Sequence, residues 1–206
     1  MIMSFSDLAK HGLKIRGIIH LGAHTAEEYE SYASLTDKVI WFEANQDLYQ
    51  KIVQTTKNNP GHRIVMKAVS DYDGTGIFRL VSHDYSSSLL PLLEHKRYYP
   101  SYVEVEQRRV PVTRLDTFFH EERVSPNEFN FLAMDIQGGE ACAIRGCGEM
   151  LKHIDYIYTE VNEAELYKGC MILPEFDRLL AEKGFVRRET KMYPEQWGDA
   201  FYTRFL

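Results

Sequence analysis

The sequence predicts an α/β fold with a mostly parallel, doubly wound sheet and an antiparallel strand at its C-terminal edge. Three observations lead to this prediction. Apolar, β-branched or aromatic runs of strand length recur along the chain. Amphipathic or polar segments of helical length follow several of these runs, as in a parallel sheet that is covered on both faces. The last two strand-like runs have only a short stretch without helical pattern between them, so they are expected to pair antiparallel.

The expected parallel strands are short apolar runs. The first ends at the glycine of "IIHLGAHTAEEYE", and the second lies in "VIWFEAN". Runs of this composition are typical of strands in a sheet covered by helices. The five runs are Ile15–Leu21, Val39–Glu43, Ile64–Ser70, Phe131–Ile136 and Tyr156–Val161.

The expected helices carry start and stop signals. Thr25 is placed to cap the first helix, and Glu28, three residues later, to close a capping box. A second helix is expected to begin near Gly139 and to run through "EACAIRGCGEMLKH". A third helix, in "LPEFDRLLAEKGF", has Pro174 at its entry and Gly184 at its stop.

The C-terminal runs "FVRRET" and "DAFYTRFL" are expected to be antiparallel neighbours at one edge of the sheet. A less regular insertion lies at about 76–116, and insertions at the carboxyl ends of strands commonly shape substrate pockets. With 206 residues and no Gly-, Pro- or Ser-rich linker, the expectation is one domain over 1–206.

Composition excludes several function classes. The formal charge of −6 disfavours a general nucleic-acid binder, and no apolar run approaches the length of a membrane span. The start, "MIMSFSDLAKHGLK", lacks the features of a signal peptide. Because Cys142, Cys147 and Cys170 have no metal-type spacing, they are expected to be reduced thiols. We therefore expect a cytoplasmic protein without a membrane span, a nucleic-acid partner or a bound metal.

Gly22 and Glu43 indicate a nucleotide-type cofactor. A glycine after the first strand allows the backbone to turn sharply and to approach a ligand closely. Glu43 ends the second strand at close to the spacing of about 20 residues at which an acidic side chain receives both hydroxyls of a ribose. The two positions together therefore predict an adenosine-containing ligand.

The loop "GAHTAE" is unsuited to a pyrophosphate. It has one glycine where dinucleotide-binding loops have three, and Glu27, Glu28 and Glu30 would repel phosphates. Glu27 and Glu30 are equally explained as carboxylates at a helix start. S-adenosylmethionine fits best, because it has a ribose and a cationic sulfonium but no phosphate. An NAD-type oxidoreductase and a non-catalytic binding module of the same fold remain alternatives.

The order of the motifs resembles that of the FkbM-type S-adenosylmethionine-dependent methyltransferases. The similar segments are "IIHLGAHTAEEY", "VIWFEAN", "KAVSDYDGTGIF", "SSSLL", "VPVTRLDTF" and "FLAMDIQGGE". Departures from the family pattern are His20, His24 and Gln137. The resemblance implies a Rossmann-like class I methyltransferase fold and cofactor contacts from Gly22, Ala23, His24, Thr25, Glu43, Ala44, Asn45, Ala68, Val69, Ser70 and Asp135.

The chemistry expected is methyl transfer to a hydroxyl. An alcohol needs a base to take its proton, and the base should stand at the carboxyl end of a central strand. Asp135 is the first candidate for base or orienting residue and Glu160 the second. His24 is a weaker candidate. Asp135 and Glu160 could also hold a magnesium ion, but two carboxylates are too few to predict a metal site.

The acceptor is expected to lie over the insertion. Tyr85, Ser86, Ser87 and Ser88 supply hydroxyls and a flat ring there, which suit a sugar. The family resemblance also implies hydroxyls of glycans or related small molecules as acceptors. A tyrosine-rich loop that only packs on the sheet is the alternative reading of the same residues.

Overall fold

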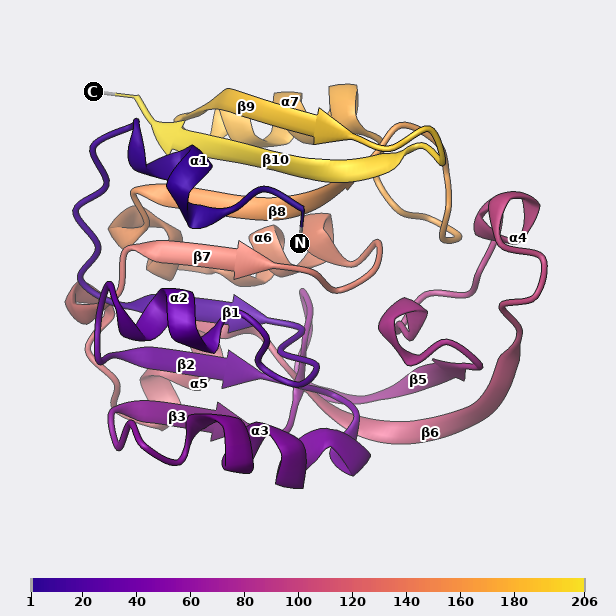
Figure 1. The fold of residues 1–206 in the computed structure, drawn as a ribbon, viewed down its shortest axis with the longest axis horizontal. Coiled ribbons are helices and arrows are strands. Elements are labelled where there is room, and N and C mark those ends of the chain that lie inside the picture. The colour runs from indigo at the N-terminus through magenta and orange to yellow at the C-terminus, as the bar shows by residue number, and fades with distance from the viewer. Residues whose placement is uncertain (1, 206) are drawn as a thin grey trace.

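The computed structural model describes residues 2–205, which form a seven-stranded sheet with helices on both faces (Figure 1). The strand order is β3-β2-β1-β7-β8-β10-β9. The five strands from β3 to β8 are parallel, and β10 runs antiparallel to β8 and β9. The predicted sheet with its antiparallel C-terminal edge is confirmed; Leu206, in the last predicted strand, lies outside the described residues. The bounds are β1 Ile18–Leu21, β2 Val39–Phe42, β3 His62–Val65, β7 Phe131–Met134, β8 Tyr156–Asn162, β9 Phe185–Met192 and β10 Trp197–Arg204.

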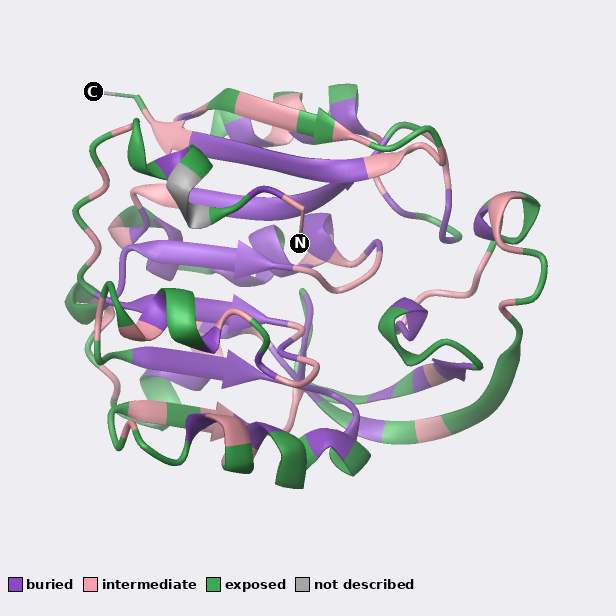
Figure 2. Cartoon of the chain, in the orientation of Figure 1, coloured by how far each residue is buried: buried purple, intermediate pink, exposed green. Residues whose placement is uncertain are grey.

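The central strands β1, β2 and β7 are buried along their whole length, which Figure 2 shows as purple arrows. Successive side chains of a strand point to opposite faces, so each strand contributes to two cores. In β1, Ile19 and Leu21 pack into one apolar cluster and Ile18 packs into the other. This double burial explains why the strands are continuous apolar runs in the sequence.

Helices cover both faces of the sheet. Leu8, Tyr32 and Ile52 bring α1, α2 and α3 to one core, and Phe118, Ile144 and Leu180 bring α5, α6 and α7 to the other. The arrangement is therefore doubly wound, as predicted. The bounds are α1 Phe5–Ala9, α2 Tyr29–Ala33, α3 Tyr49–Thr56, α5 Leu115–Glu121, α6 Glu140–Gly146 and α7 Leu173–Glu182; short 3₁₀ turns are η1 Gln46–Leu48, η2 Asp84–Ser86, η3 Pro126–Glu128 and η4 Gly148–His153.

Three local predictions are wrong. The helix expected to run from near Gly139 to His153 ends at Gly146, and the chain continues as the 3₁₀ turn η4. The predicted capping box of Thr25 and Glu28 does not form: α2 begins only at Tyr29, and Glu28 makes no side-chain cap. The chain instead turns through His24 and Ala26, whose φ angles are 47° and 58°. The predicted strand Ile64–Ser70 is two strands, because the chain leaves β3 after Val65 and pairs again as β4 (Ala68–Val69) in a second sheet.

The predicted insertion supplies most of a second sheet, which has the order β4-β6-β5. Its long hairpin, β5 (Gly74–Val81) and β6 (Glu104–Thr113), extends beyond the carboxyl ends of the main strands (Figure 1). Residues 82–103, with α4 (His95–Tyr98), connect its two strands. Across residues 2–205, none of the helices has the length and apolar character needed to cross a bilayer.

Candidate functional site

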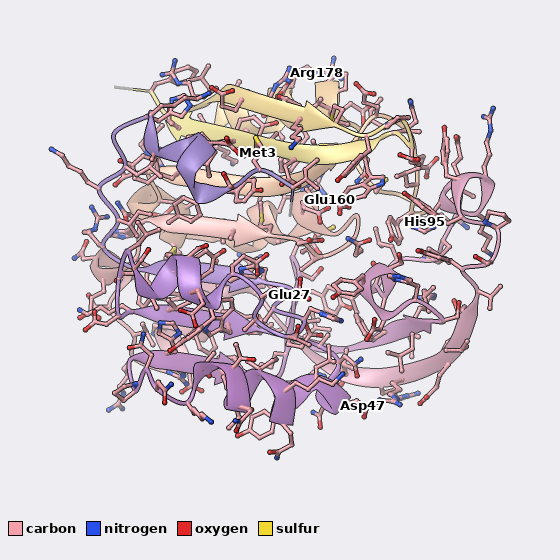
Figure 3. The ribbon with its side chains drawn as sticks, viewed as in Figure 1. Met3, Glu27, Asp47, His95, Glu160 and Arg178 are labelled. Atoms are coloured by element: carbon pink, nitrogen blue, oxygen red, sulfur yellow. The ribbon has the colours of Figure 1, made fainter. Side chains whose placement is uncertain are left out.

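Two adjoining pockets lie where the main strands end. We call them the glycine-side pocket, between the segments that follow β1, β2 and β3, and the tyrosine-side pocket, between β8 and the segment 82–103. Asp135, Gln137 and Tyr85 line both pockets. The glycine-side pocket has an empty volume of about 870 Å³, counted out to solvent, which is within the range of small-molecule sites. Figure 3 shows Glu160 and His95 on opposite sides of the tyrosine-side pocket.

Gly22 is required by the packing of the chain itself. A Cβ atom at this position would stand 1.9 Å from the carbonyl oxygen of Asp135, and the φ angle of Gly22 is +86°. The N–H groups of Gly22 and Ala23 both donate to the carbonyl oxygen of Phe42 at 2.9 Å. The glycine therefore lets the ends of β1, β2 and β7 come together and form the floor of the glycine-side pocket.

Glu43 is buried at the end of β2 and lines the same pocket. Its Oε2 accepts the N–H of His24 at 2.8 Å, and its Oε1 accepts the N–H of Asn45 at 2.7 Å. Burial raises the pKa of Glu43, while these backbone donors favour its charged form. Because each carboxylate oxygen has a second lone pair, Glu43 can still accept hydrogen bonds from a diol.

Most of the predicted cofactor residues meet in the glycine-side pocket, but two do not line it. Ala23 is packed under α2 in the core, and Thr25 is turned away, so that its hydroxyl faces Glu27 at 3.3 Å. The left-handed φ of His24 separates these neighbours from the pocket wall. The residues that do line it are Gly22, His24, Glu43, Ala44, Asn45, Ala68, Val69, Ser70 and Asp135.

The sequence analysis missed the apolar part of this wall. Leu48 and Phe78 come from η1 and β5, and Leu89, Leu90 and Ile136 from the loops. Apolar residues of this kind carry no sequence signal that separates a pocket wall from the core.

His24 and Tyr85 join the loop after β1 to the segment after β5. Their rings stack with a centroid separation of 3.9 Å, and His24 Nε2 lies 3.3 Å from Asp84 Oδ2. The Tyr85 hydroxyl donates to Glu27 Oε1 at 2.5 Å, and this hydrogen bond, ahead of burial, raises the pKa of Tyr85 to about 12. The predicted catalytic candidate His24 is thus part of a contact between two loops at the wall of the glycine-side pocket.

The two predicted acids share one amide. Gln137 Nε2 donates to Asp135 Oδ1 at 2.7 Å and to Glu160 Oε2 at 2.8 Å. Its Oε1 accepts the hydroxyl of Tyr167, and its backbone carbonyl accepts the Ser88 hydroxyl at 2.7 Å. Gln137 also has a φ of 56°. Sequence reasoning missed this bridging position, because Glu160, Tyr167 and Ser88 are distant from Gln137 in the chain.

Glu160 and Glu140 are buried carboxyl groups with raised pKa values. Burial is the main cause for both, and the charges of Asp135 and Glu140 add to it for Glu160. The pKa of Glu140 rises to about 7, although its Oε1 accepts the N–H of Ile136 at 3.0 Å. Of the two, only Glu160 lines a pocket, so it is the one placed for acid–base chemistry.

The predicted acceptor residues separate between the two pockets. Tyr85 lines both, Ser87 lines the glycine-side pocket, and Ser86 lines the tyrosine-side pocket. The hydroxyl of Ser88 is engaged by Gln137, and that of Ser87 accepts the N–H of Val81 at 3.1 Å. The rings of His83 and Tyr99 also line the tyrosine-side pocket, and those that sequence reasoning missed there are His95, Tyr102, Tyr167 and Trp197.

Metal-ligating residues do not gather in the part of the chain that the structure describes: residues 2–205 contain no group of three or more His, Cys, Asp or Glu placed to hold a metal ion. Cys142, Cys147 and Cys170 are free cysteines.

Comparison with protein families matches residues 20–187 to the methyltransferase FkbM domain. The search of curated proteins finds no match.

Solved structures similar to this chain share its fold at low sequence identity. A protein of the NADB-Rossmann superfamily from Streptococcus agalactiae has a TM-score of 0.54 and 10% identity, over 99% of this chain and 69% of its own. A proposed RNA methyltransferase from Pyrococcus horikoshii has a TM-score of 0.52 and 9% identity, over 98% of this chain and 80% of its own. Magnesium protoporphyrin IX methyltransferase from Synechocystis PCC 6803, with bound S-adenosylmethionine, has a TM-score of 0.52 and 7% identity, over 97% of this chain and 76% of its own.

Proposed function

The chain belongs to the FkbM methyltransferase domain family, and we propose from this that it transfers a methyl group from S-adenosylmethionine to a hydroxyl of a sugar, glycan or related small molecule. One observation carries the proposal. The glycine-side and tyrosine-side pockets meet at Asp135, so a cofactor in the first and an acceptor in the second would share a carboxylate at their boundary.

The glycine-side pocket has the donors and acceptors for the cofactor. Glu43 is the proposed partner of the ribose hydroxyls, and the loop of Gly22 and His24 the support of the methionine part. Ala68 and Val69, with the apolar side chains of Leu48 and Phe78, would pack against the adenine. Ala23 and Thr25 are left out of this proposal because they face away from the pocket.

Asp135 is the proposed base, with Glu160 second. When bound, S-adenosylmethionine supplies a methyl carbon that leaves its sulfonium sulfur as the acceptor oxygen bonds to it, so the hydroxyl proton must pass to another group. Asp135 lines both pockets and is held in place by Gln137, which supports its assignment as the proton acceptor. His24 is a poorer choice, because its ring is stacked on Tyr85 and its Nε2 faces Asp84.

The tyrosine-side pocket and the segment 76–116 are the proposed acceptor side of a single methyltransferase domain. Asp135 and Glu160 line this pocket, and among the residues that the structure describes no lysine or arginine does. A nucleic-acid backbone needs basic side chains, so a small-molecule acceptor is favoured over RNA. Its tyrosine and tryptophan rings offer flat surfaces for the C–H face of a sugar.

A transfer assay with methyl-labelled S-adenosylmethionine and a panel of hexoses tests the proposal. The wild type is expected to label at least one sugar, and Asp135→Asn to lose about 10²–10⁴-fold in kcat, the contribution of a positioned base. Binding of S-adenosylhomocysteine to this variant should remain. Glu149→Gln, a change at an exposed carboxylate paired with Lys152, is the matched control. Undiminished turnover in Asp135→Asn would remove Asp135 as the base, and labelling of tRNA instead of sugars would overturn the acceptor class.

A further inference from the structure

The aromatic lining of the tyrosine-side pocket is a connected set of rings. Tyr102 stacks on His83 at a centroid separation of 4.6 Å and on Tyr99 at 4.9 Å. Trp197 Nε1 donates to the Tyr99 hydroxyl at 3.0 Å, which ties the set to β10. Tyr167, another ring of the lining, is buried, and its hydroxyl donates to Gln137 Oε1. A pocket with this lining presents flat, electron-rich surfaces whose positions are fixed before a ligand arrives.

The charge in and around this pocket is negative. Asp135 and Glu160 line it, and the charges of buried Glu140 and Asp199 act on Glu160 from behind. No lysine or arginine lines the pocket. Burial, with the charge of His83, lowers the pKa of His95 to about 4, so His95 adds no positive charge at neutral pH. Within the described residues, a ligand in this pocket therefore meets carboxyl groups with no lysine or arginine beside them, while the imidazole of His83 lies on the wall formed by the segment 82–103.

The positive charge of the cofactor accounts for only one of the two carboxylates. Asp135 lines the glycine-side pocket as well, so it would face the sulfonium region of bound S-adenosylmethionine. Glu160 lines only the tyrosine-side pocket, and its side chain accepts a hydrogen bond from the neutral amide of Gln137. A buried charged carboxylate is stable only when it is paired, and within residues 2–205 the hydrogen bond from Gln137 gives Glu160 a neutral donor and no cation.

We infer that the tyrosine-side pocket binds an acceptor that carries an ammonium group next to the hydroxyl that is methylated, as an amino sugar does, with the ammonium on Glu160 and the aromatic rings. The inference rests on the proposed function and specifies its acceptor. Ammonium groups are attracted both to carboxylates and to the faces of aromatic rings. A neutral sugar would bring no cation to stabilise the ionised form of Glu160, and a phosphorylated sugar would be repelled by the carboxylates.

Calorimetric titration with matched sugars tests this inference. Glucosamine, galactosamine and mannosamine are compared with their N-acetyl forms at pH 7 and low salt, in the presence of saturating S-adenosylhomocysteine. The best free amine is expected to bind at least about tenfold more tightly than its N-acetyl form, because only the amine is a cation. Since the pKa of Glu160 is raised by burial, a cation beside it should also release a proton, which appears as a dependence of the binding heat on the buffer.

Two variants place the effect in the pocket. Glu160→Gln is expected to reduce the preference for the amine below about threefold and to remove the proton release, because the charged partner is gone. Trp197→Leu, a change in the aromatic lining of the pocket, is expected to weaken the binding of the amino sugar without removing the proton release. Glu149→Gln, outside the pocket, should behave as the wild type. Thermal unfolding of each variant checks that it is folded.

The outcomes separate this inference from the proposed function. If S-adenosylhomocysteine does not bind the wild type, the methyltransferase proposal fails. If it binds but the N-acetyl sugars bind as tightly as the amines, or no amine binds, only the ammonium inference is overturned. Retention of the full preference by Glu160→Gln would overturn the role of Glu160.

Discussion

At the scale of single residues, the site depends on one amide between two carboxylates. Gln137 uses both N–H bonds of its side chain, one toward Asp135 and one toward Glu160, and Tyr167 fixes which end of the amide faces them. The shared neutral donor holds the two acids side by side, although burial and the charge of Asp135 still raise the pKa of Glu160. Gln137 is thus a positioning residue for both acids.

Replacing Gln137 by Glu should destabilise the protein at high pH. A third carboxyl group beside Asp135 and Glu160 would have a raised pKa, so the folded state would hold a proton that the unfolded state has lost. We expect the free energy of unfolding at pH 8 to fall by about 1–3 kcal/mol relative to the wild type, with a smaller loss at pH 5. Urea denaturation at both pH values measures it.

Gln137→Met is the matched variant, because it removes the amide without adding charge. Its loss of stability should be nearly the same at the two pH values. A Glu variant as stable as the wild type at pH 8 would show that the three side chains are not in contact as described.

Single residues were predictable from sequence where their role follows from local position. Glu43 at the end of β2 and Asp135 after β7 lie in the glycine-side pocket as the strand pattern led us to expect. The predicted cap at Thr25 failed because His24 adopts a left-handed φ and the helix starts later. The bridging role of Gln137 could not be predicted, because its partners Glu160 and Tyr167 are 23 and 30 residues away.

At the scale of elements, the end of β1 depends on the absence of a side chain at Gly22. In Gly22→Ala the new Cβ would overlap the Asp135 carbonyl oxygen and the residue would keep a φ of +86°. We expect a loss of more than about 3 kcal/mol in the free energy of unfolding, because strands β1 and β7 must move apart. Chemical denaturation of the purified variant measures the loss.

Gly12→Ala is the control for the backbone conformation alone. Gly12 has a φ of +65°, but a Cβ there would meet nothing within 4 Å. The free energy of unfolding of Gly12→Ala should fall by about 1–2 kcal/mol, which is the cost of a left-handed conformation. Equal losses in the two variants would contradict the close approach of β1 and β7.

Elements were predictable where their pattern is local. The strands β1, β2, β7 and β8 and the helix α7 appear where the apolar runs, Pro174 and Gly184 placed them. Helix α6 begins after Gly139 as expected but ends at Gly146, short of the expected end. The break between β3 and β4 was missed, because it depends on β4 pairing with β6, a strand far along the chain. The short helices α1, α3 and α5 were also missed.

At the scale of the whole molecule, burial of acidic groups under the pockets makes stability depend on pH. The pKa of Glu140 rises from 4.5 to about 7 on folding. Between these values the folded state binds a proton that the unfolded state does not, so the free energy of unfolding falls as the pH rises through this window, by up to about 1.4 kcal/mol per pH unit.

Glu140→Gln should remove this part of the pH dependence. The amide keeps an oxygen to accept the N–H of Ile136 and cannot ionise. The variant should gain stability relative to the wild type as the pH increases from 5 to about 7.5, by about 1–3 kcal/mol. Thermal unfolding across this pH range measures the difference. A constant difference between the two proteins would contradict the burial of an ionisable group at this position, and Glu149→Gln should show no such trend.

The central claim is that the glycine-side pocket holds S-adenosylmethionine through Glu43. The most direct measurement is calorimetric titration with S-adenosylhomocysteine, with NAD as the comparison ligand, on the wild type, Glu43→Ala and the exposed control Glu30→Gln. We predict micromolar binding of S-adenosylhomocysteine by the wild type and the control, a loss of at least about tenfold in Glu43→Ala, and no comparable binding of NAD. Unchanged affinity in folded Glu43→Ala, or a wild type that binds NAD and ignores S-adenosylhomocysteine, would contradict the account.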